Sequence, residues 1–157
     1  MSTPARQEVR PATAQDAPAI GRLLHDFNTE YDDPTPGSDK LADRIARLLA
    51  GGDTAVLLAG QGPDGLAVLR FREALWSEAL ECYLAELYVV PAMRGHGLGR
   101  SLMNAAMEFA RGRGADYMDL GTAETDVAAR ALYESLGFSN REGKPDGPLN
   151  FYYEREL

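Results

Sequence analysis

The sequence predicts an α/β domain with about six or seven strands and about four helices. Apolar residues recur at helical spacing in four stretches, and the stretches between them are short and rich in β-forming residues. Glycine, proline and aspartate cluster at the junctions. At 157 residues the chain has the usual size of one domain, so we expect a single domain over residues 1–157.

Two helices and three strands are expected in the first half of the chain. The first helix follows a cap at Thr13 or Asp16 and carries an apolar stripe. The connection 31–37 contains two prolines and a glycine, so no regular element persists there. A Gly-Pro-Asp-Gly turn then joins two strands in a hairpin. The expected bounds are 8–11, 54–59 and 66–72 for strands and 13–29 and 40–50 for helices.

The second half continues the alternation of strands and helices. Along the strand that leads toward Pro91, regular alternation places Leu84, Glu86, Tyr88 and Val90 on one face of the sheet. Gly137 follows the last helix and suits the left-handed residue that ends many helices. The expected bounds are 81–90, 117–121, 138–141 and 149–156 for strands and 98–112 and 127–136 for helices.

The most informative motif joins the strand at 81–90 to the helix at 98–112. Three glycines leave main-chain amides uncovered at the positive end of a helix dipole, and two arginines flank them, which suits a pyrophosphate. The glycine spacing does not match the dinucleotide fingerprint, and the motif lacks the lysine of a nucleoside-triphosphate loop. The expected ligands are Arg94, Gly95, His96, Gly97, Leu98, Gly99, Arg100 and Ser101.

A second motif, Ala-x-x-Leu-Tyr-x-x-x-Gly-Phe, runs from Ala129 to Phe138. Together with Arg94-x-x-Gly97-x-Gly99, it resembles the GCN5-related N-acetyltransferase (GNAT) family. The resemblance implies the acyl-CoA N-acyltransferase fold, in which the helices flank a mixed central sheet. It implies acetyl-CoA as cosubstrate and no metal. It also implies transfer of an acetyl group to a primary amine, by direct attack in a ternary complex. It extends over nearly the whole chain, although the first half matches only in its order of elements.

The resemblance implies that Tyr133 is the general acid that protonates the leaving coenzyme thiolate. A phenol is neutral at pH 7 and can donate a proton to a thiolate, whereas a tyrosine that only packs is the alternative. Many family members have asparagine where this chain has Asp126. Asp126 therefore either accepts a hydrogen bond from the pantetheine arm or caps the helix that follows. Ala129 is expected in the same cofactor-binding segment.

The strand before the glycine-rich turn supplies two further groups in the family. The resemblance places a backbone N–H that holds the thioester oxygen at Val89, and a candidate general base at Glu86. A glutamate that faces solvent, or that pairs with Arg70 or Arg72, is the alternative for Glu86. The residues of this strand expected beside the cofactor are Leu87, Tyr88 and Val89.

The acceptor is predicted from the charge of the chain and from the place of its acidic stretch in the family. The net charge is −8, from 24 acidic and 16 basic residues, which disfavours nonspecific nucleic-acid binding and favours cationic substrates. In the family, the acidic stretch at 28–33 borders the acceptor cleft, although a solvated acidic turn is the alternative. The acceptor would be a small cationic amine, an aminoglycoside-like compound or a peptide or lysine amine. The candidate contacts are Asn28, Glu30, Tyr31, Asp32, Asp33, Trp76 and Tyr152.

The remaining composition bears on location and partners. No apolar run approaches the roughly 20 residues of a membrane span, and residues 1–8 lack a signal-peptide core, so we expect a cytoplasmic protein. Cys82 is the single cysteine, which excludes an internal disulfide, and the sequence has no cysteine cluster that would indicate a metal site. Aromatic residues at 149–156 are compatible with a homodimer, and sheet packing within one chain is the alternative that explains them equally well. The alternative function is an acyl-CoA-binding sensor or regulatory module without turnover.

Overall fold

A computed structural model describes residues 8–157, and the chain divides into two compact units, Met1–Asp119 and Leu120–Leu157. Residues 1–7, which belong to the stretch expected to lack a signal-peptide core, lie outside the described residues. The single domain over 1–157 stays a prediction. No helix in the part that the structure describes is long and apolar enough to cross a membrane.

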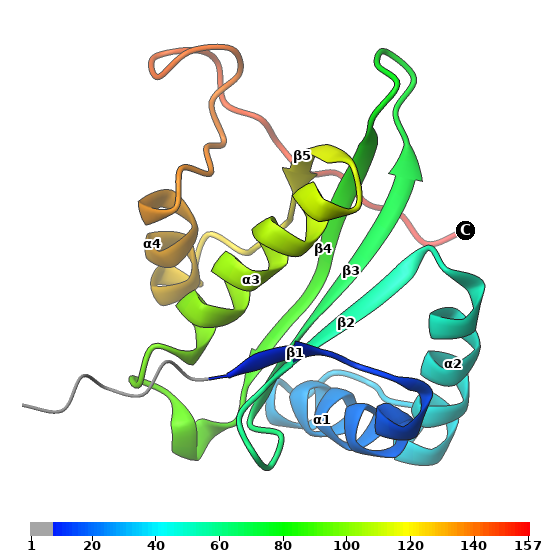
Figure 1. The fold of residues 1–157 in the computed structure, drawn as a ribbon. Helices are drawn as coiled ribbons and strands as arrows, with labels where there is room; N and C mark the ends of the chain where they lie inside the picture. The colour runs from blue at the N-terminus through cyan, green and yellow to red at the C-terminus, as the bar shows by residue number, and fades with distance from the viewer. Residues whose placement is uncertain (1–7) are drawn as a thin grey trace, which may run out of the picture. The chain divides into compact units, whose positions relative to one another are not determined.

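The first unit is built on a five-stranded sheet in the order β1-β2-β3-β4-β5 (Figure 1). The first four strands are antiparallel to their neighbours, and β4 pairs with β5 in parallel. A mixed sheet is therefore confirmed. The strands are β1 (Val9–Pro11), β2 (Thr54–Ala59), β3 (Gly65–Glu73), β4 (Leu80–Val89) and β5 (Ala115–Asp119).

Helices cover both faces of this sheet (Figure 1). Helices α1 (Ala17–Glu30) and α2 (Ser38–Gly51) pack on one face, and α3 (Leu98–Gly112) packs on the other. Short 3-10 turns precede α1 at Ala14–Asp16 and follow β4 at Pro91–Met93. The apolar stripes predict the buried sides correctly. The core on the α1–α2 face contains Ile20, Leu23, Ile45, Val56, Leu58, Leu66, Val68 and Tyr88, and α3 buries Leu98, Leu102, Met103, Ala106 and Ala110.

A bulge interrupts the middle of β4. The register pairs Leu69 with Leu84 and Val68 with Glu86, which leaves Ala85 as an extra residue on β4. Because paired side chains share a face and neighbours along β3 do not, Leu84 and Glu86 lie on opposite faces. The expectation that they share a face was wrong, because alternation read from sequence assumes a strand without a bulge.

The second unit contains α4 (Val127–Ser135), which ends as the sequence predicts. Gly137 has φ +92°, and its amide donates to the Glu134 carbonyl at 3.1 Å. The amide of Phe138 donates to the Tyr133 carbonyl at 3.0 Å, and the two rings lie 6.1 Å apart. This pair of hydrogen bonds with its apolar contact is the Schellman ending of a helix, which requires a left-handed residue at Gly137.

The expected strands at 138–141 and 149–156 are not formed. In their place, the described chain forms one isolated antiparallel bridge between Arg141 and Leu149. The connection between them contains Pro145, Pro148 and a left-handed Gly143, and prolines lack the N–H that a ladder needs. The sheet therefore has five strands in the described residues rather than six or seven. The exposed aromatic residues of this segment are Phe151, Tyr152 and Tyr153.

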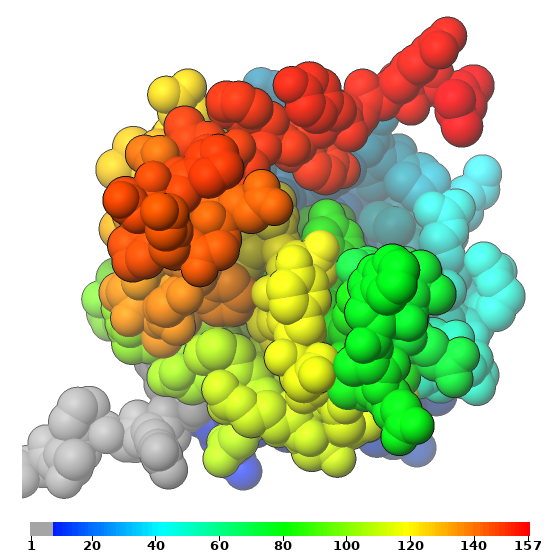
Figure 2. Space-filling model, turned by 90° about the horizontal axis from the view of Figure 1, so that it is seen from above, coloured from blue at the N-terminus to red at the C-terminus, as the bar shows by residue number. Residues whose placement is uncertain are grey.

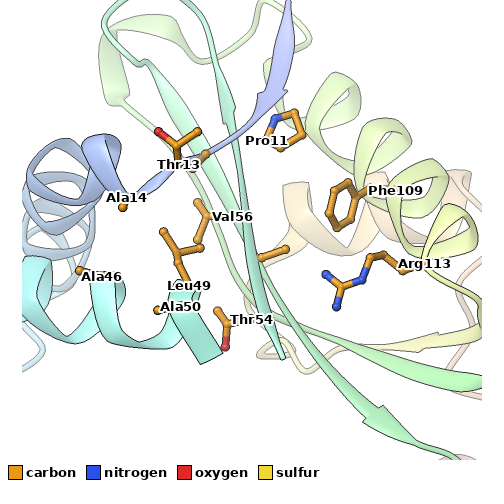
Figure 3. Close-up of a pocket in the computed structure, with 12 residues that line it drawn as sticks. Pro11, Thr13, Ala14, Ala46, Leu49, Ala50, Thr54, Val56, Phe109 and Arg113 are labelled. Atoms are coloured by element: carbon orange, nitrogen blue, oxygen red, sulfur yellow. The ribbon is translucent and has the colours of Figure 1, made fainter. Parts of the chain in front are cut away.

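An apolar hollow of about 310 Å³ lies at the outer edge of β2, beyond the end of β1 (Figure 3). Ala46, Leu49 and Ala50 of α2 line one side, and Phe109 of α3 and Arg113, the residue after α3, line the other (Figure 3). None of its lining residues belongs to the predicted active site, so the hollow is a separate feature of the first unit.

Candidate active site

The edge of β4 opens where β5 stops pairing with it. The parallel pairing runs from Leu80 to Tyr83 and ends there. Further along, the Val90 amide donates to the Asp64 carbonyl at 2.9 Å, on the β3 side. Because amides alternate in direction along an antiparallel strand, those of Leu87 and Val89 point away from β3. Within the first unit, this edge therefore presents two preoriented N–H donors, and the role of Val89 toward the thioester oxygen stays a prediction.

The glycine-rich turn presents three further amides at the start of α3. Gly97 is the N-cap with φ +83° and offers no capping side chain. The Ser101 amide donates to the Gly97 carbonyl at 3.0 Å, so the amides of Leu98, Gly99 and Arg100 precede the first helical bond. The first turn contains no acidic residue, and it contains Arg100. A helix start with no acidic residue in its first turn and no capping side chain favours anions, so the turn fits a pyrophosphate.

Arg94, the first residue of the motif, is engaged by the end of α1. Its Nη2 lies 2.8 Å from Oε2 of Glu30 and 2.9 Å from Oε1. Its Nε donates to the Val89 carbonyl at 3.0 Å, and its guanidinium lies 5.7 Å from the centre of the Tyr88 ring. Glu30 was expected to contact the acceptor and Arg94 the pyrophosphate, whereas the structure brings the two together. No signal in the sequence pairs residues that are 64 positions apart.

Tyr88 completes this contact from the sheet. Its hydroxyl donates to Oε1 of Glu30 at 3.1 Å, and its ring lies 4.8 Å from Phe27. Burial and the neighbouring carboxylate raise the pKa of Tyr88 to about 12. The phenol is therefore protonated at working pH and acts as a fixed hydrogen-bond donor to Glu30.

Glu86 lies on the α1–α2 face next to the bulge and remains open to solvent. The protein around it still replaces part of its water, and this desolvation raises the pKa of Glu86. Arg72 pairs with Glu81 at 2.6 Å, and it does not pair with Glu86. Access to solvent together with a raised pKa is what a general base requires.

The acidic stretch at the end of α1 has its own internal bonds. The Asn28 amide side chain donates to the Pro34 carbonyl at 2.7 Å, and the Asp33 amide donates to the Asn28 carbonyl at 2.8 Å. Asp32 is left-handed, with φ +57°, and Tyr31 is half exposed. Asn28 therefore holds the shape of the loop, while the side chains of 31–33 stay available at the surface.

Trp76 does not lie near this stretch. It sits in the β3–β4 connection, which forms a surface knob (Figure 2, green), and it is 96% exposed. The ten residues of β4 separate this connection from the glycine-rich turn by roughly 30 Å. The hairpin thus carries Trp76 to the opposite end of β4, so Trp76 is not brought together with the other candidate acceptor contacts at 28–33.

In the second unit, Asp126 occupies the N-cap position of α4 without capping it through its side chain. Its carboxylate accepts instead from the Thr122 hydroxyl at 3.0 Å and from the Ala123 amide at 3.2 Å. The helix cap expected from the sequence was therefore wrong in its bonding. Burial, and secondarily this carboxylate, raise the pKa of Tyr133, so its phenol stays protonated well above neutral pH. Tyr152 is largely exposed.

Among the described residues, no group of three or more histidine, cysteine, aspartate or glutamate side chains is placed to hold a metal ion. Cys82 is fully buried in β4, and burial raises the pKa of its thiol to about 11. This thiol is therefore a packed side chain with low reactivity.

Comparison with known proteins identifies the family. The model of the acetyltransferase (GNAT) family matches residues 20–138. The uncharacterized N-acetyltransferase YjgM of Escherichia coli (strain K12) is 34% identical over 141 residues, covering 84% of this chain and 81% of that protein. Aminoglycoside N(6')-acetyltransferase type 1 of Klebsiella aerogenes is 33% identical over 103 residues, covering 60% of this chain and 68% of that enzyme.

A solved structure agrees over the full length. A protein from Arthrobacter sp. FB24, named as an acetyltransferase by inference, superposes with a TM-score of 0.89 at 44% identity, covering 100% of both chains. The chain also matches mycothiol acetyltransferases, of whose length it spans between 23% and 35%. The family model covers most of the chain and the sheet opens before an uncapped glycine-rich turn. The chain therefore belongs to the acetyltransferase (GNAT) family and is an acetyl-CoA-dependent N-acetyltransferase.

Proposed function

We propose that this enzyme transfers the acetyl group of acetyl-CoA to the primary amine of a small cationic acceptor, by direct attack in a ternary complex. The observation that carries the proposal is the start of α3. There, three amides precede the first helical bond, no acidic side chain caps them, and the open edge of β4 comes immediately before. A helix start of this kind binds a diphosphate without any metal ligand.

Each part of the site has a task in this proposal. The amides of Leu98, Gly99 and Arg100 bind the pyrophosphate, with the Arg100 guanidinium adding positive charge. Acetyl-CoA supplies the thioester that the amine attacks. The Val89 amide holds the thioester oxygen, and a preoriented donor of this kind contributes about 3 kcal/mol to the transition state. Leu87 presents a second amide on the same edge for the pantetheine arm.

Two side chains move protons in the proposed reaction. Glu86 accepts the proton that the acceptor amine loses, and its raised pKa makes it a stronger base than an ordinary glutamate. Tyr133 donates a proton to the coenzyme thiolate that leaves, and its raised pKa keeps the phenol in the acid form. Asp126 keeps its free oxygen as an acceptor for the pantetheine arm.

The proposed acceptor is an aminoglycoside-like polyamine. The net charge of −8 and the exposed carboxylates of Asp32 and Asp33 favour a cation. The Klebsiella aerogenes relative is named for acetylation of aminoglycosides. A lysine or peptide amine is the second candidate on the same charge argument. Location in the cytoplasm and pairing into a homodimer stay predictions.

Coenzyme release measured with a thiol reagent tests the proposal. Acetyl-CoA is incubated with a panel of amines that includes aminoglycosides, linear polyamines and lysine peptides. Cys82 adds little background because it is fully buried. We expect release that depends on a cationic amine and saturates with it. Coenzyme binding with no release for any amine would instead favour a sensor, and no coenzyme binding at all would overturn the proposal.

A further inference from the structure

We propose that Arg94 is not a pyrophosphate ligand, and that it ties the coenzyme turn to the end of α1 with Glu30 as a positioning residue. This inference rests on the proposed binding of coenzyme A at the turn. It reassigns two side chains that the sequence alone gives to two different ligands. The ion pair between them is called the Glu30–Arg94 tether below.

The geometry commits one of the two phosphate-binding edges of the Arg94 guanidinium, the Nε–Nη2 edge, to contacts inside the protein. An arginine binds a phosphate or carboxylate through two parallel N–H groups on one edge of its fork. In this structure Nε donates to the Val89 carbonyl, and Nη2 contacts both oxygens of Glu30, at 2.8 and 2.9 Å. The edge formed by Nε and Nη2 is therefore used inside the protein.

Glu30 is held in turn from a second direction. The Tyr88 hydroxyl donates to Oε1 at 3.1 Å, and the pKa of about 12 keeps that donor protonated. The Glu30 side chain is 27% exposed and that of Arg94 is 42% exposed. A pair this accessible contributes little to global stability. Its effect is local, because it fixes where the chain enters the glycine-rich turn.

The tether also reaches the catalytic edge of β4. Arg94 binds the carbonyl of Val89, the residue whose amide is proposed to hold the thioester oxygen. The same arginine is the first residue of the turn, and Glu30 is the last residue of α1, directly before the acidic loop. One ion pair thus sets the start of the coenzyme turn, the end of β4 and the end of the helix that precedes the acceptor loop. Glu30 is neutralised by it and does not bind the acceptor.

The substitution Glu30→Gln distinguishes the two possible roles of Arg94, because the tether and the phosphate-ligand role predict opposite changes in coenzyme A affinity. If Glu30 positions the turn, its loss weakens coenzyme A binding, by roughly fivefold for a pair this exposed. If Arg94 is a phosphate ligand, the same substitution releases the guanidinium and tightens binding. Asp43→Asn removes one negative charge from an exposed position on α2 and is the matched control, with unchanged affinity expected. Tyr88→Phe weakens binding less than Glu30→Gln does.

A charge reversal supplies the rescue. Arg94→Glu and Glu30→Arg each weaken coenzyme A binding by roughly tenfold, because two like charges then face each other. The double variant restores the pair and returns the affinity to within about threefold of the wild type. Double-variant affinity as poor as that of Arg94→Glu would overturn the inference, because an acid beside the pyrophosphate would then be the cause.

Calorimetry with coenzyme A is the measurement for all of these variants, and urea unfolding verifies that each one folds. Where the reversed pair does not fold, a cycle of Glu30→Gln, Arg94→Gln and their combination replaces it. In that cycle a double loss no larger than either single loss supports the tether, and strictly additive losses contradict it. Absence of binding by the wild type would remove the proposed function itself, so the two failures are distinguishable.

Discussion

Replacing Gly97 by alanine tests the anion site at the start of α3 most directly. Gly97 has φ +83°, and a Cβ placed on it meets no atom within 4 Å. The cost of alanine is therefore purely conformational. A left-handed residue other than glycine costs about 1–2 kcal/mol. If alanine keeps the left-handed conformation, the strain lowers the stability of the folded protein. If the turn instead relaxes to negative φ, the folded protein is not strained, and coenzyme binding becomes weaker because the turn must be reshaped.

The two costs are shared, so we expect their sum to be about 1–2 kcal/mol. If the whole cost falls on binding, the affinity for coenzyme A weakens by roughly 5- to 30-fold, since RT is about 0.59 kcal/mol. If the whole cost falls on folding, Tm decreases by about 2–8 °C for a chain of this size. Calorimetry with coenzyme A measures the first quantity, and urea unfolding measures the second.

Gly112, at the other end of α3, is the matched control. It also meets no atom within 4 Å at a new Cβ, but its φ is not left-handed. Gly112→Ala therefore raises stability by about 0.4–1 kcal/mol and leaves coenzyme affinity unchanged. Gly97→Ala with wild-type affinity and wild-type stability would refute the argument, because the turn would then not depend on its left-handed residue.

Three further substitutions have defined outcomes. Glu86→Gln lowers kcat by about 100-fold or more, because the general base is lost. The wild-type rate falls as the pH drops through the raised pKa of the Glu86 carboxyl, which must be ionised to accept a proton. A Glu86→Gln variant with the wild-type pH–rate profile would exclude the base role. Tyr133→Phe lowers kcat by about 100-fold at unchanged coenzyme affinity, whereas full activity in single-turnover assays would leave Tyr133 a packing residue. Gly21→Ala drives a Cβ into the Ser38 carbonyl and the Ala42 amide, so urea unfolding shows a loss of about 1–3 kcal/mol, against no loss for Gly51→Ala.

Local patterns predicted most of the first unit. The helices were predicted to within a few residues because an apolar stripe and its cap lie within one segment. Gly137 was predicted as left-handed from its place after the last helix, and the Schellman hydrogen bonds confirm it. The two missing strands at the end of the chain show the limit of this approach. Aromatic alternation at 149–156 favours a strand, but a strand forms only where a partner supplies the ladder.

In the candidate site too, features set by neighbouring residues were predicted and features set by distant residues were not. The sequence by itself determined the glycine-rich turn, the absence of an acidic cap and the family motifs, since these depend on neighbouring residues whose chemistry is independent of the rest of the chain. Only the tertiary structure decided the bulge at Ala85, the open edge of β4 and the contact between Glu30 and Arg94. Each of these depends on strand register or on residues far apart in the chain, and pairing energies across such distances leave no periodic trace in the sequence.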